Sequence, residues 1–342
     1  MKNLLVTGGA GFIGSNFARM MLERYTGIRI VVYDKLTYAG NPQNLADLAP
    51  RFGDRYAFVQ GDIADAAAAG AAFGSFDIDT VVNFAAATHV DRSILGAEDF
   101  LQTDVAGTHV LLEAARVRGI ERYLQVSTDE VYGEVLTGAS TERDALAPRN
   151  PYSASKAGGD LMALAYHHTY GAPVVVTRGC NTYGPFQYPE KVIPLFTTNA
   201  LEDRPLPLYG DGKQVREWIH VLDHCSGIDT ALRHGEPGHA YNVGSGEERE
   251  NIQVTRLILE TLNKHDSLIQ PVADRPGHDR RYHLDSSKLR GLGWAPAHRF
   301  EDALPATVRW YRDHPGWWRP LKSGEYLAYY QQQYGARLSN GI

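Results

Sequence analysis

The stretch Thr7-Gly8-Gly9-Ala10-Gly11-Phe12-Ile13-Gly14 follows a short apolar run and opens a segment of helix-forming composition. A glycine-rich turn between a strand and a helix lets backbone N–H groups and the helix dipole meet a pyrophosphate. Asp34 ends the next apolar run, twenty residues after Gly14, where an acidic side chain accepts hydrogen bonds from the ribose of a dinucleotide. A carboxylate there repels a 2′-phosphate, so we expect NAD rather than NADP, although Lys35 weakens that preference.

Short β-branched runs alternate with Ala- and Leu-rich segments through the first half of the chain. The apolar runs are residues 4–6, 30–33, 56–59, 80–84, 123–126 and 173–176, and the segments between them include 14–25, 66–72, 104–118 and 153–170. Continuous apolar strands separated by helices indicate a parallel sheet that is covered on both faces. We therefore predict an α/β protein built on a Rossmann-type, doubly wound parallel sheet.

Prolines interrupt the chain after about residue 180, at Pro185, Pro189, Pro194, Pro205 and Pro207. Because proline is excluded from central strands and helix interiors, we predict a second, smaller lobe of mixed α/β structure. Residues 215–234 regain helix-like character and precede an apolar run at 240–243, so the chain is expected to return to the first lobe.

We expect discontinuous domains. Residues 1–181 and about 216–250 should form the NAD-binding domain, and about 182–215 and 251–320 the second domain. Residues 321–342 are expected to form a C-terminal tail.

Composition narrows the class of protein. The 342 residues are 43% hydrophobic and 22% charged, which is typical of a folded globular chain. A net charge of -6 gives no reason to bind nucleic acid or an anionic membrane, and no apolar run approaches the length of a membrane helix. Two cysteines and an opening strand in place of a signal peptide favour the cytoplasm.

Tyr152 and Lys156 are four residues apart, so both project from one face of a helix. A phenol with a pKa of about 10 is a poor base, but a neighbouring ammonium group and a positive nicotinamide both favour the phenolate. Ser127 ends an apolar run 25 residues before Tyr152. With the dinucleotide turn upstream, this pattern indicates that Tyr152 deprotonates a hydroxyl group while the attached carbon gives a hydride to NAD⁺.

The glycine turn and the Tyr-x-x-x-Lys spacing resemble those of the extended short-chain dehydrogenases/reductases. Within that superfamily, Ser127-Thr128-Asp129-Glu130-Val131-Tyr132-Gly133 resembles the dTDP-glucose 4,6-dehydratase family, as do segments 34–41, 89–93, 183–185, 189–191 and 274–280. The resemblance implies an NAD-dependent lyase that converts dTDP-glucose to dTDP-4-keto-6-deoxyglucose. It also implies that the second domain binds the sugar nucleotide.

Asp129 and Glu130 are adjacent carboxyl groups directly after an apolar run, where such folds place ligands. A ketone at C4 of the sugar makes the C5 proton acidic, so Glu130 can remove it while a neutral Asp129 protonates the departing C6 hydroxyl group. The resemblance implies that Thr128 hydrogen-bonds the sugar near O4. The predicted catalytic residues are Thr128, Asp129, Glu130, Tyr152 and Lys156.

The predicted cofactor-binding residues combine the glycine turn and Asp34 with strand ends that the resemblance implies. They are Gly8, Gly11, Phe12, Ile13, Gly14, Asp34, Lys35, Leu36, Thr37, Asp62, Ile63, Phe84, Ala85, Ala87, Thr103, Ser127, Tyr152, Lys156 and Thr182. No metal site is predicted, because His220 and His224 have helical spacing but no third ligand. Cys180 is interpreted as a packing residue.

Arg216, Arg275 and His278 have suitable donors for a diphosphate, with a surface ion pair as the alternative for each arginine. The resemblance supplies the remaining substrate contacts, including a thymine cradle at residues 207–209. The predicted substrate-binding residues are Thr88, His89, Thr128, Asn181, Lys191, Val192, Pro207, Tyr209, Arg216, Asn251, Arg275 and His278.

The chain departs from the family pattern at two positions. Ala87 stands where the family usually has glutamate, and Thr182 where it usually has a second asparagine. Because a polar anchor is missing near the reacting groups, we hypothesise that some 4-ketoglucose nucleotide is released before dehydration.

Two alternative functions stay open at this stage. A sugar-nucleotide 4-epimerase or decarboxylase uses the same fold and the same first hydride step, but the adjacent acids argue against an epimerase. A non-catalytic NAD-binding regulatory protein would not need Tyr152, Lys156 and the two acids together. UDP-glucose is only weakly disfavoured as substrate, and cell-surface and secondary-metabolite sugar pathways stay equally open. The apolar content of segments 104–118 and 153–170 predicts a homodimer.

Overall fold

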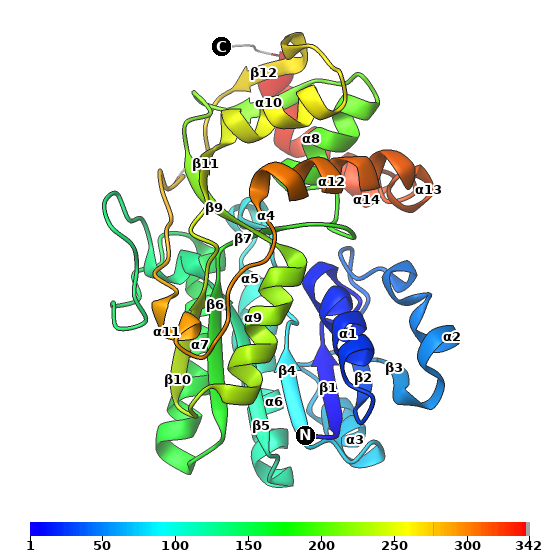
Figure 1. Ribbon diagram of the computed structural model, residues 1–342, viewed down its shortest axis with the longest axis vertical. Helices are drawn as coiled ribbons and strands as arrows, with labels where there is room; N and C mark the ends of the chain where they lie inside the picture. Colours follow the sequence, from blue (N-terminus) through cyan, green and yellow to red (C-terminus); the bar gives the residue numbers. More distant parts are fainter. Residues whose placement is uncertain (276, 340–342) are drawn as a thin grey trace.

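The computed structural model describes residues 1–275 and 277–339 and has two lobes, with the smaller one at the top of Figure 1. Pro276, within the predicted segment 274–280, and residues 340–342 of the predicted tail lie outside the described residues. The larger lobe contains a seven-stranded sheet of order β10-β6-β5-β4-β1-β2-β3. Its strands are β1 (Asn3–Thr7), β2 (Arg29–Asp34), β3 (Tyr56–Gln60), β4 (Thr80–Asn83), β5 (Arg122–Thr128), β6 (Val174–Gly179) and β10 (His239–Val243).

All neighbouring strands of this sheet run parallel, so the predicted α/β fold with a doubly wound sheet is confirmed. Both faces of the sheet are buried. Leu4 and Val6 pack on the side of helices α1 and α9, whereas Leu5 packs on the side of α3, α6 and α7. Burial on both faces explains why the strands are continuous apolar runs rather than alternating ones. The helices and helical turns of this lobe are α1 (Phe12–Arg24), η1 (Pro42–Leu45), α2 (Leu48–Phe52), η2 (Gly53–Arg55), α3 (Ala66–Ser75), α4 (Val90–Leu95), α5 (Glu98–Phe100), η3 (Leu101–Gly107), α6 (Thr108–Arg118), η4 (Asp129–Tyr132), α7 (Pro151–Tyr170), α9 (Val221–His234) and α11 (Ser287–Arg290).

The smaller lobe is built around a second apolar core, which joins helices α8, α10 and α12 to the last helices of the chain. A two-stranded sheet, in which β8 pairs in parallel with β12, lies at its edge. A three-stranded sheet of order β11-β9-β7 lies between the lobes in Figure 1. The elements are β7 (Asn181–Tyr183), α8 (Val192–Leu201), β8 (Leu206–Tyr209), β9 (Val215–His220), β11 (Glu248–Glu250), α10 (Asn251–Thr261), η5 (Asp266–Leu268), β12 (Ile269–Val272), α12 (Phe300–Asp313), α13 (Pro315–Trp318), α14 (Glu325–Tyr330), η6 (Gln331–Gly335) and α15 (Ala336–Ser339).

The prediction that residues 215–234 have helix-like character is wrong for the first six of them. Val215–His220 forms strand β9, which pairs with β7 on one side and β11 on the other. Backbone partners on both sides outweigh the local helix propensity of this segment. Helix α9 begins only at Val221.

The end of the described chain packs into the smaller lobe. Tyr326 and Tyr334 are buried in its core beside Leu206 and Leu304. The division into domains at the boundaries given above stays a prediction. Within the described residues, no helix combines the length and apolar character that crossing a membrane would require.

A buried polar network fixes helix α7 against the sheet. Arg178 on β6 donates from Nε to Asp160 Oδ2 at 2.8 Å and from Nη1 to the Tyr132 hydroxyl at 2.7 Å. Tyr132 in turn donates to Asn242 Oδ1 on β10 at 2.8 Å. The network ties α7, η4, β6 and β10 together, and so holds the predicted catalytic segments of α7 and η4 in register.

Candidate active site

A cavity of about 460 Å³ opens at the carboxyl ends of the parallel strands. Its walls are the glycine turn, the ends of β2 to β5, the start of α7 and the segment after β6. It brings together all five predicted catalytic residues and every predicted cofactor residue except Leu36. Leu36 has a left-handed backbone (φ 58°) and packs against the core, while its N–H group donates to Asp34.

The glycines of this turn allow neighbouring backbone segments to approach one another closely. Gly8 has φ +63°, and a Cβ atom there would lie 2.6 Å from the backbone nitrogen of Ala85. A Cβ at Gly14 would lie 2.5 Å from the carbonyl oxygen of Gly8. Gly11 is the N-cap of α1 and has no side chain to cap it, so the first amides of a 13-residue helix are left for a ligand at the cavity wall. The turn therefore fits a dinucleotide pyrophosphate.

Asp34 fastens this turn to strand β2. Its Oδ2 accepts from the Ala10 N–H at 2.9 Å, and its Oδ1 accepts from the Leu36 N–H at 2.8 Å. Burial raises the pKa of the carboxyl group, and the two backbone donors act in the opposite direction. A carboxylate oxygen can accept more than one hydrogen bond, so the group can also receive ribose hydroxyl groups.

The two adjacent acids lie on η4, immediately beyond the end of β5. Thr128, the last residue of the strand, caps the turn by accepting from the Glu130 N–H at 3.3 Å and donates to Asp129 Oδ1 at 3.0 Å. The other oxygen of Asp129 is buried and has no hydrogen-bond partner within the described residues. Burial and the charge of Glu130 raise the pKa of Asp129 to about 8, so this carboxyl group is neutral at pH 7 and can act as an acid.

Tyr152 and Lys156 line the cavity from the first turns of α7. The Lys156 ammonium group donates to the carbonyl oxygen of Val126 at 2.7 Å. Burial raises the pKa of Tyr152 well above its ordinary value, and the negative charges of Glu130 and Asp104 add to the effect, as does Asp129 once it is ionised, whereas a hydrogen bond with Thr128 opposes it. Tyr152 therefore needs a nearby positive charge before it can act as a base.

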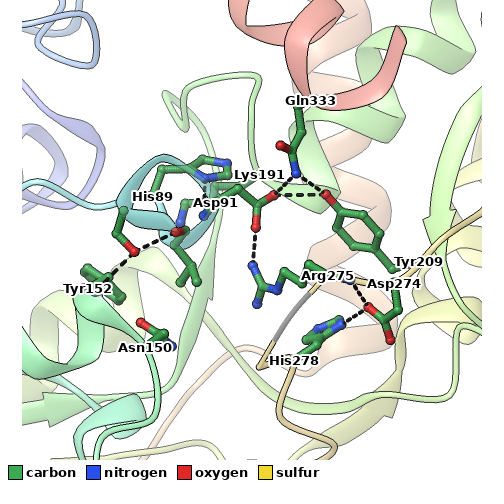
Figure 2. Close-up of polar contacts among 12 residues, drawn as sticks. His89, Asp91, Asn150, Tyr152, Lys191, Tyr209, Asp274, Arg275, His278 and Gln333 are labelled. Atoms are coloured by element: carbon green, nitrogen blue, oxygen red, sulfur yellow. Dashed lines mark hydrogen bonds and ion pairs between the residues drawn. The ribbon is translucent and has the colours of Figure 1, made fainter. Parts of the chain in front are cut away.

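The predicted substrate-binding residues divide into two groups. Thr88, Thr128, Asn181, Lys191 and Val192 line the cavity. His89, Pro207, Tyr209, Arg216, Asn251, Arg275 and His278 lie outside it. Of the second group, Figure 2 shows Tyr209 and Arg275 bonded to Asp91, and His278 beside Asp274.

Three of the outer residues lie close to one another. Burial lowers the pKa of His278 to about 4, and the positive charges of Arg275 and Arg216 contribute to that shift. Arg275 donates from Nη1 to Asp91 Oδ1 at 2.6 Å, so its guanidinium group is held by an internal ion pair. Arg216 is buried and donates to the carbonyl oxygens of Val215 and Asp279, both at 2.8 Å. The donors predicted for a diphosphate are thus gathered, but already have partners in the protein.

Asp91 also binds Tyr209, a residue of the predicted thymine cradle. Tyr209 donates to Asp91 Oδ2 at 3.0 Å, and the Gln333 amide donates to the same oxygen at 3.0 Å and to the Tyr209 hydroxyl at 2.7 Å (Figure 2). Gln333 belongs to the predicted tail, so the end of the chain contributes to this side of the site.

Several residues of the site were not predicted. Asn150 is the N-cap of α7 and also donates to Glu130 Oε2 at 3.4 Å, and an asparagine directly before Pro151 is a helix-start signal in the sequence. Asp104 is buried behind Ala87 and Ser155, and nothing in its local sequence distinguishes it. His224, discounted as a metal ligand, lines the cavity, and its Nδ1 lies 2.7 Å from the Thr182 hydroxyl oxygen.

A sequence model of the family described as GDP-mannose 4,6 dehydratase matches residues 5–307. The chain belongs to this family. The resemblance drawn from the Asp129-Glu130 segment is likewise confirmed by relatives named dTDP-glucose 4,6-dehydratase.

One such relative, from Streptomyces niveus, is 49% identical over 325 residues, which cover 94% of this chain and 96% of the relative. A Haloferax volcanii protein described as low-salt glycan biosynthesis protein Agl12 is 50% identical, covering 90% of this chain and 98% of that protein.

Solved structures agree with the sequence relatives. The crystal structure of DesIV, a dTDP-glucose 4,6-dehydratase from Streptomyces venezuelae with NAD and dTDP bound, superimposes with a TM-score of 0.91 at 51% identity. It covers 94% of this chain and 100% of that one. The UDP-glucose 4-epimerase of Thermus thermophilus, with NAD, is similar at 32% identity and a TM-score of 0.85, covering 91% and 99%. Because dehydratase and epimerase share the fold, the choice between them depends on the site.

We predict that Asp34→Ala weakens NAD binding at least tenfold and reduces discrimination against NADP. The variant loses both the ribose acceptor and the fastening of the glycine turn, and hydrogen bonds to a charged group are worth about 1.5–3 kcal/mol each. Isothermal titration calorimetry with each cofactor measures the change. Asp54→Ala, at an exposed aspartate of η2, is the control. NAD affinity within twofold of the parent protein would contradict the prediction.

Proposed function

We propose that this chain catalyses the NAD-dependent dehydration of dTDP-glucose to dTDP-4-keto-6-deoxyglucose. The observation that carries the proposal is the placement of Asp129 and Glu130 beside Tyr152 in one cavity, with Asp129 neutral at pH 7. Family membership and the relatives named dTDP-glucose 4,6-dehydratase support it.

The residues that would hold NAD are the glycine turn for the pyrophosphate and Asp34 for the ribose, with the ends of β4 and β5 leading toward Tyr152. When bound, NAD would supply the hydride acceptor for C4 of the sugar, the hydride donor for C6 and the positive charge of its nicotinamide ring.

In the oxidation step, Tyr152 removes the proton of the C4 hydroxyl group. Thr128 lowers the pKa of the phenol. Lys156, held by the carbonyl oxygen of Val126, adds positive charge to the buried wall. Together they lower the cost of forming a phenolate in a site where burial opposes it.

In the elimination step, Glu130 removes the C5 proton, which the new C4 ketone has made acidic. Asp129 gives its proton to the C6 oxygen, the C6–O bond breaks, and water leaves. Return of the hydride to C6 and of a proton to C5 completes the product. Substrate equals product plus one water, so there is no net oxidation.

The outer group of residues would bind the nucleotide. Arg275, Arg216 and His278 are near enough to influence one another electrostatically, and a diphosphate is the dianion that such a cluster accommodates. The diphosphate would replace Asp91 as the partner of Arg275.

The direct test is to incubate the purified protein with dTDP-glucose and to record the alkaline absorbance of a 4-keto-6-deoxy product. We expect this product for dTDP-glucose and much less for UDP-glucose. Formation of the galactose epimer, decarboxylation of a uronic-acid substrate alone, or no turnover would reject the proposal. The last outcome would favour a non-catalytic NAD-binding protein.

We predict that Asp129→Asn still oxidises the sugar but eliminates water about 10²–10⁴-fold more slowly, because it cannot donate the proton. In the parent protein, elimination should decline above about pH 8, where Asp129 loses its proton, and the variant should lack this decline. Rapid-quench mass spectrometry across pH separates the two steps. Elimination by the variant at the parent rate would remove Asp129 from the acid role.

We also propose that some 4-ketoglucose nucleotide leaves before dehydration, because Ala87 provides no carboxylate at the cavity wall. The released ketone should be detectable by mass spectrometry in amounts comparable to the enzyme, and Ala87→Glu should suppress it. If only the species lighter by one water appears for both proteins, release does not occur.

We propose that the protein is a homodimer joined through α6 and α7. Exposed apolar side chains gather on and beside these helices, with Leu161 on α7 55% exposed and Leu101 on η3 58% exposed. Exposed apolar side chains on neighbouring helices favour a symmetric partner. Light scattering should give about twice the chain mass of 37.8 kDa, and Leu161→Glu should give monomers. A monomeric parent protein at micromolar concentration would contradict the assignment.

We further propose a cytoplasmic location for this enzyme. Both cysteines, Cys180 and Cys225, are buried free thiols, which suits a reducing compartment.

A further inference from the structure

Asp104 is a buried acid that the steps above do not use. Its side chain lies outside the cavity and is bonded to Ala87, which forms part of the cavity wall. Its Oδ1 accepts from the backbone N–H of Ala87 at 3.0 Å, and its Oδ2 accepts from the Ser155 hydroxyl at 2.6 Å. Ser155 lies between Tyr152 and Lys156 on α7, and its hydroxyl also contacts the Tyr152 carbonyl oxygen at 2.8 Å. One carboxyl group therefore joins the end of β4 to the turn of α7 that carries both predicted catalytic side chains.

The backbone conformation around Asp104 brings this residue close to helix α7. Residues Leu101–Gly107 form a π-helical stretch, η3, a local widening that is frequent at functional sites. Helix α7 approaches η3 at Gly159, where a Cβ atom would lie 2.5 Å from the carbonyl oxygen of Asp104. Only a glycine permits this approach without displacing one of the two backbones. The position of Asp104 against α7 is thus fixed by main chain on both sides.

Among the described residues, the charged groups that face Asp104 belong to the candidate active site. Lys156 and Tyr152 face it from α7, and the segment after β4 contributes the Ala87 amide. Asp160 on α7 also acts on Lys156, and Asp129 and Glu130 on η4 also act on Tyr152. Burial raises the pKa of Asp104 to about 6, while Lys156, Ser155 and the Ala87 amide hold it down, so the group is ionised at neutral pH.

Lys156 needs this negative charge. Burial lowers the pKa of its ammonium group, and Asp104 is the largest influence in the opposite direction, followed by Asp160. Asp160 is already engaged by Arg178 at 2.8 Å, so much of its charge is neutralised. The same Asp104 charge raises the pKa of Tyr152. Both groups that the oxidation step depends on therefore respond in the same direction to one carboxylate.

We propose that Asp104 is a positioning residue for the oxidation step, which fixes Ala87 and Ser155 by hydrogen bonds and sets, through its buried negative charge, the pH range in which Tyr152 and Lys156 act together. This inference rests on the proposed function, because it assigns Asp104 a role in that reaction.

The test removes the negative charge of Asp104 but keeps the shape of its side chain. Asp104→Asn is made in the Asp129→Asn background, so that elimination and the titration of Asp129 do not contribute. Single-turnover reduction of bound NAD by dTDP-glucose is followed by absorbance from pH 5.5 to 9.5. We expect the optimum of the oxidation rate to move to lower pH by about one unit, because loss of a nearby negative charge lowers the pKa of both Tyr152 and Lys156.

Two control variants distinguish an electrostatic effect of Asp104 from a structural one. Ser155→Ala in the same background loses the 2.6 Å hydrogen bond but keeps the carboxylate, so its alkaline limb should stay in place. Glu98→Gln removes an exposed negative charge on α5, nearby in the chain, and should leave the whole profile unchanged. A merely structural role for Asp104 would lower the rate in both the Asn and Ala variants without moving the optimum.

A second measurement does not depend on turnover. In infrared spectra of the purified protein, a band from a protonated carboxyl group should grow as the pH falls through about 6 and be missing in Asp104→Asn. If the parent protein does not act on dTDP-glucose, the proposed function fails while this band still reports on Asp104. Identical pH profiles with and without Asp104, or identical infrared titrations, would overturn the inference.

Discussion

Parallel strand pairing is the constraint on which the rest of this structure depends. Because β1 pairs in parallel with both β2 and β4, and β4 with β5, the carboxyl ends of these strands meet at one edge of the sheet. The glycine turn, Asp34, Ala87 and the Asp129-Glu130 pair all lie at these ends or within a few residues of them. Residues separated by more than a hundred positions in sequence thereby form one wall of one cavity. A slip of one residue in any strand would turn its buried side chains to the opposite face and break this convergence.

The second property of the site is that several ionisable side chains are shielded from water. Asp129, Asp104 and Lys156 are buried, and Tyr152, which is half-buried, lies close enough to both acids to be influenced by them. Burial acts on all of them, raising the pKa of the acids and the phenol and lowering that of the amine. Each group then titrates according to its neighbours rather than its ordinary value, which is how one site can hold a neutral acid and a prospective phenolate side by side.

The fold was predictable from sequence because its signals are local. The strand runs and the glycine turn each occupy a few consecutive residues, and the Tyr152-Lys156 pair falls within one helical turn. The strand β9 was not predictable from its own residues, since it is made by pairing with β7 and β11. Asp104 also escaped detection, because its importance comes from Ala87 and Ser155, which approach it only in the folded chain.

The outer part of the site shows even more clearly that contacts made only in the folded chain cannot be predicted from local sequence. The sequence indicates that Arg275 has the right donors for a diphosphate, but not that Asp91, 184 residues away, already accepts from it. Exchange of Asp91 for a diphosphate would leave that carboxylate without its strongest partner, and an unpaired buried charge is costly. Here Tyr209 and Gln333 donate to Asp91 Oδ2, so the carboxylate would keep two hydrogen bonds if Arg275 turned to a diphosphate. Through this hydrogen bond, Gln333 would lower the cost of releasing the arginine that we propose as a diphosphate ligand.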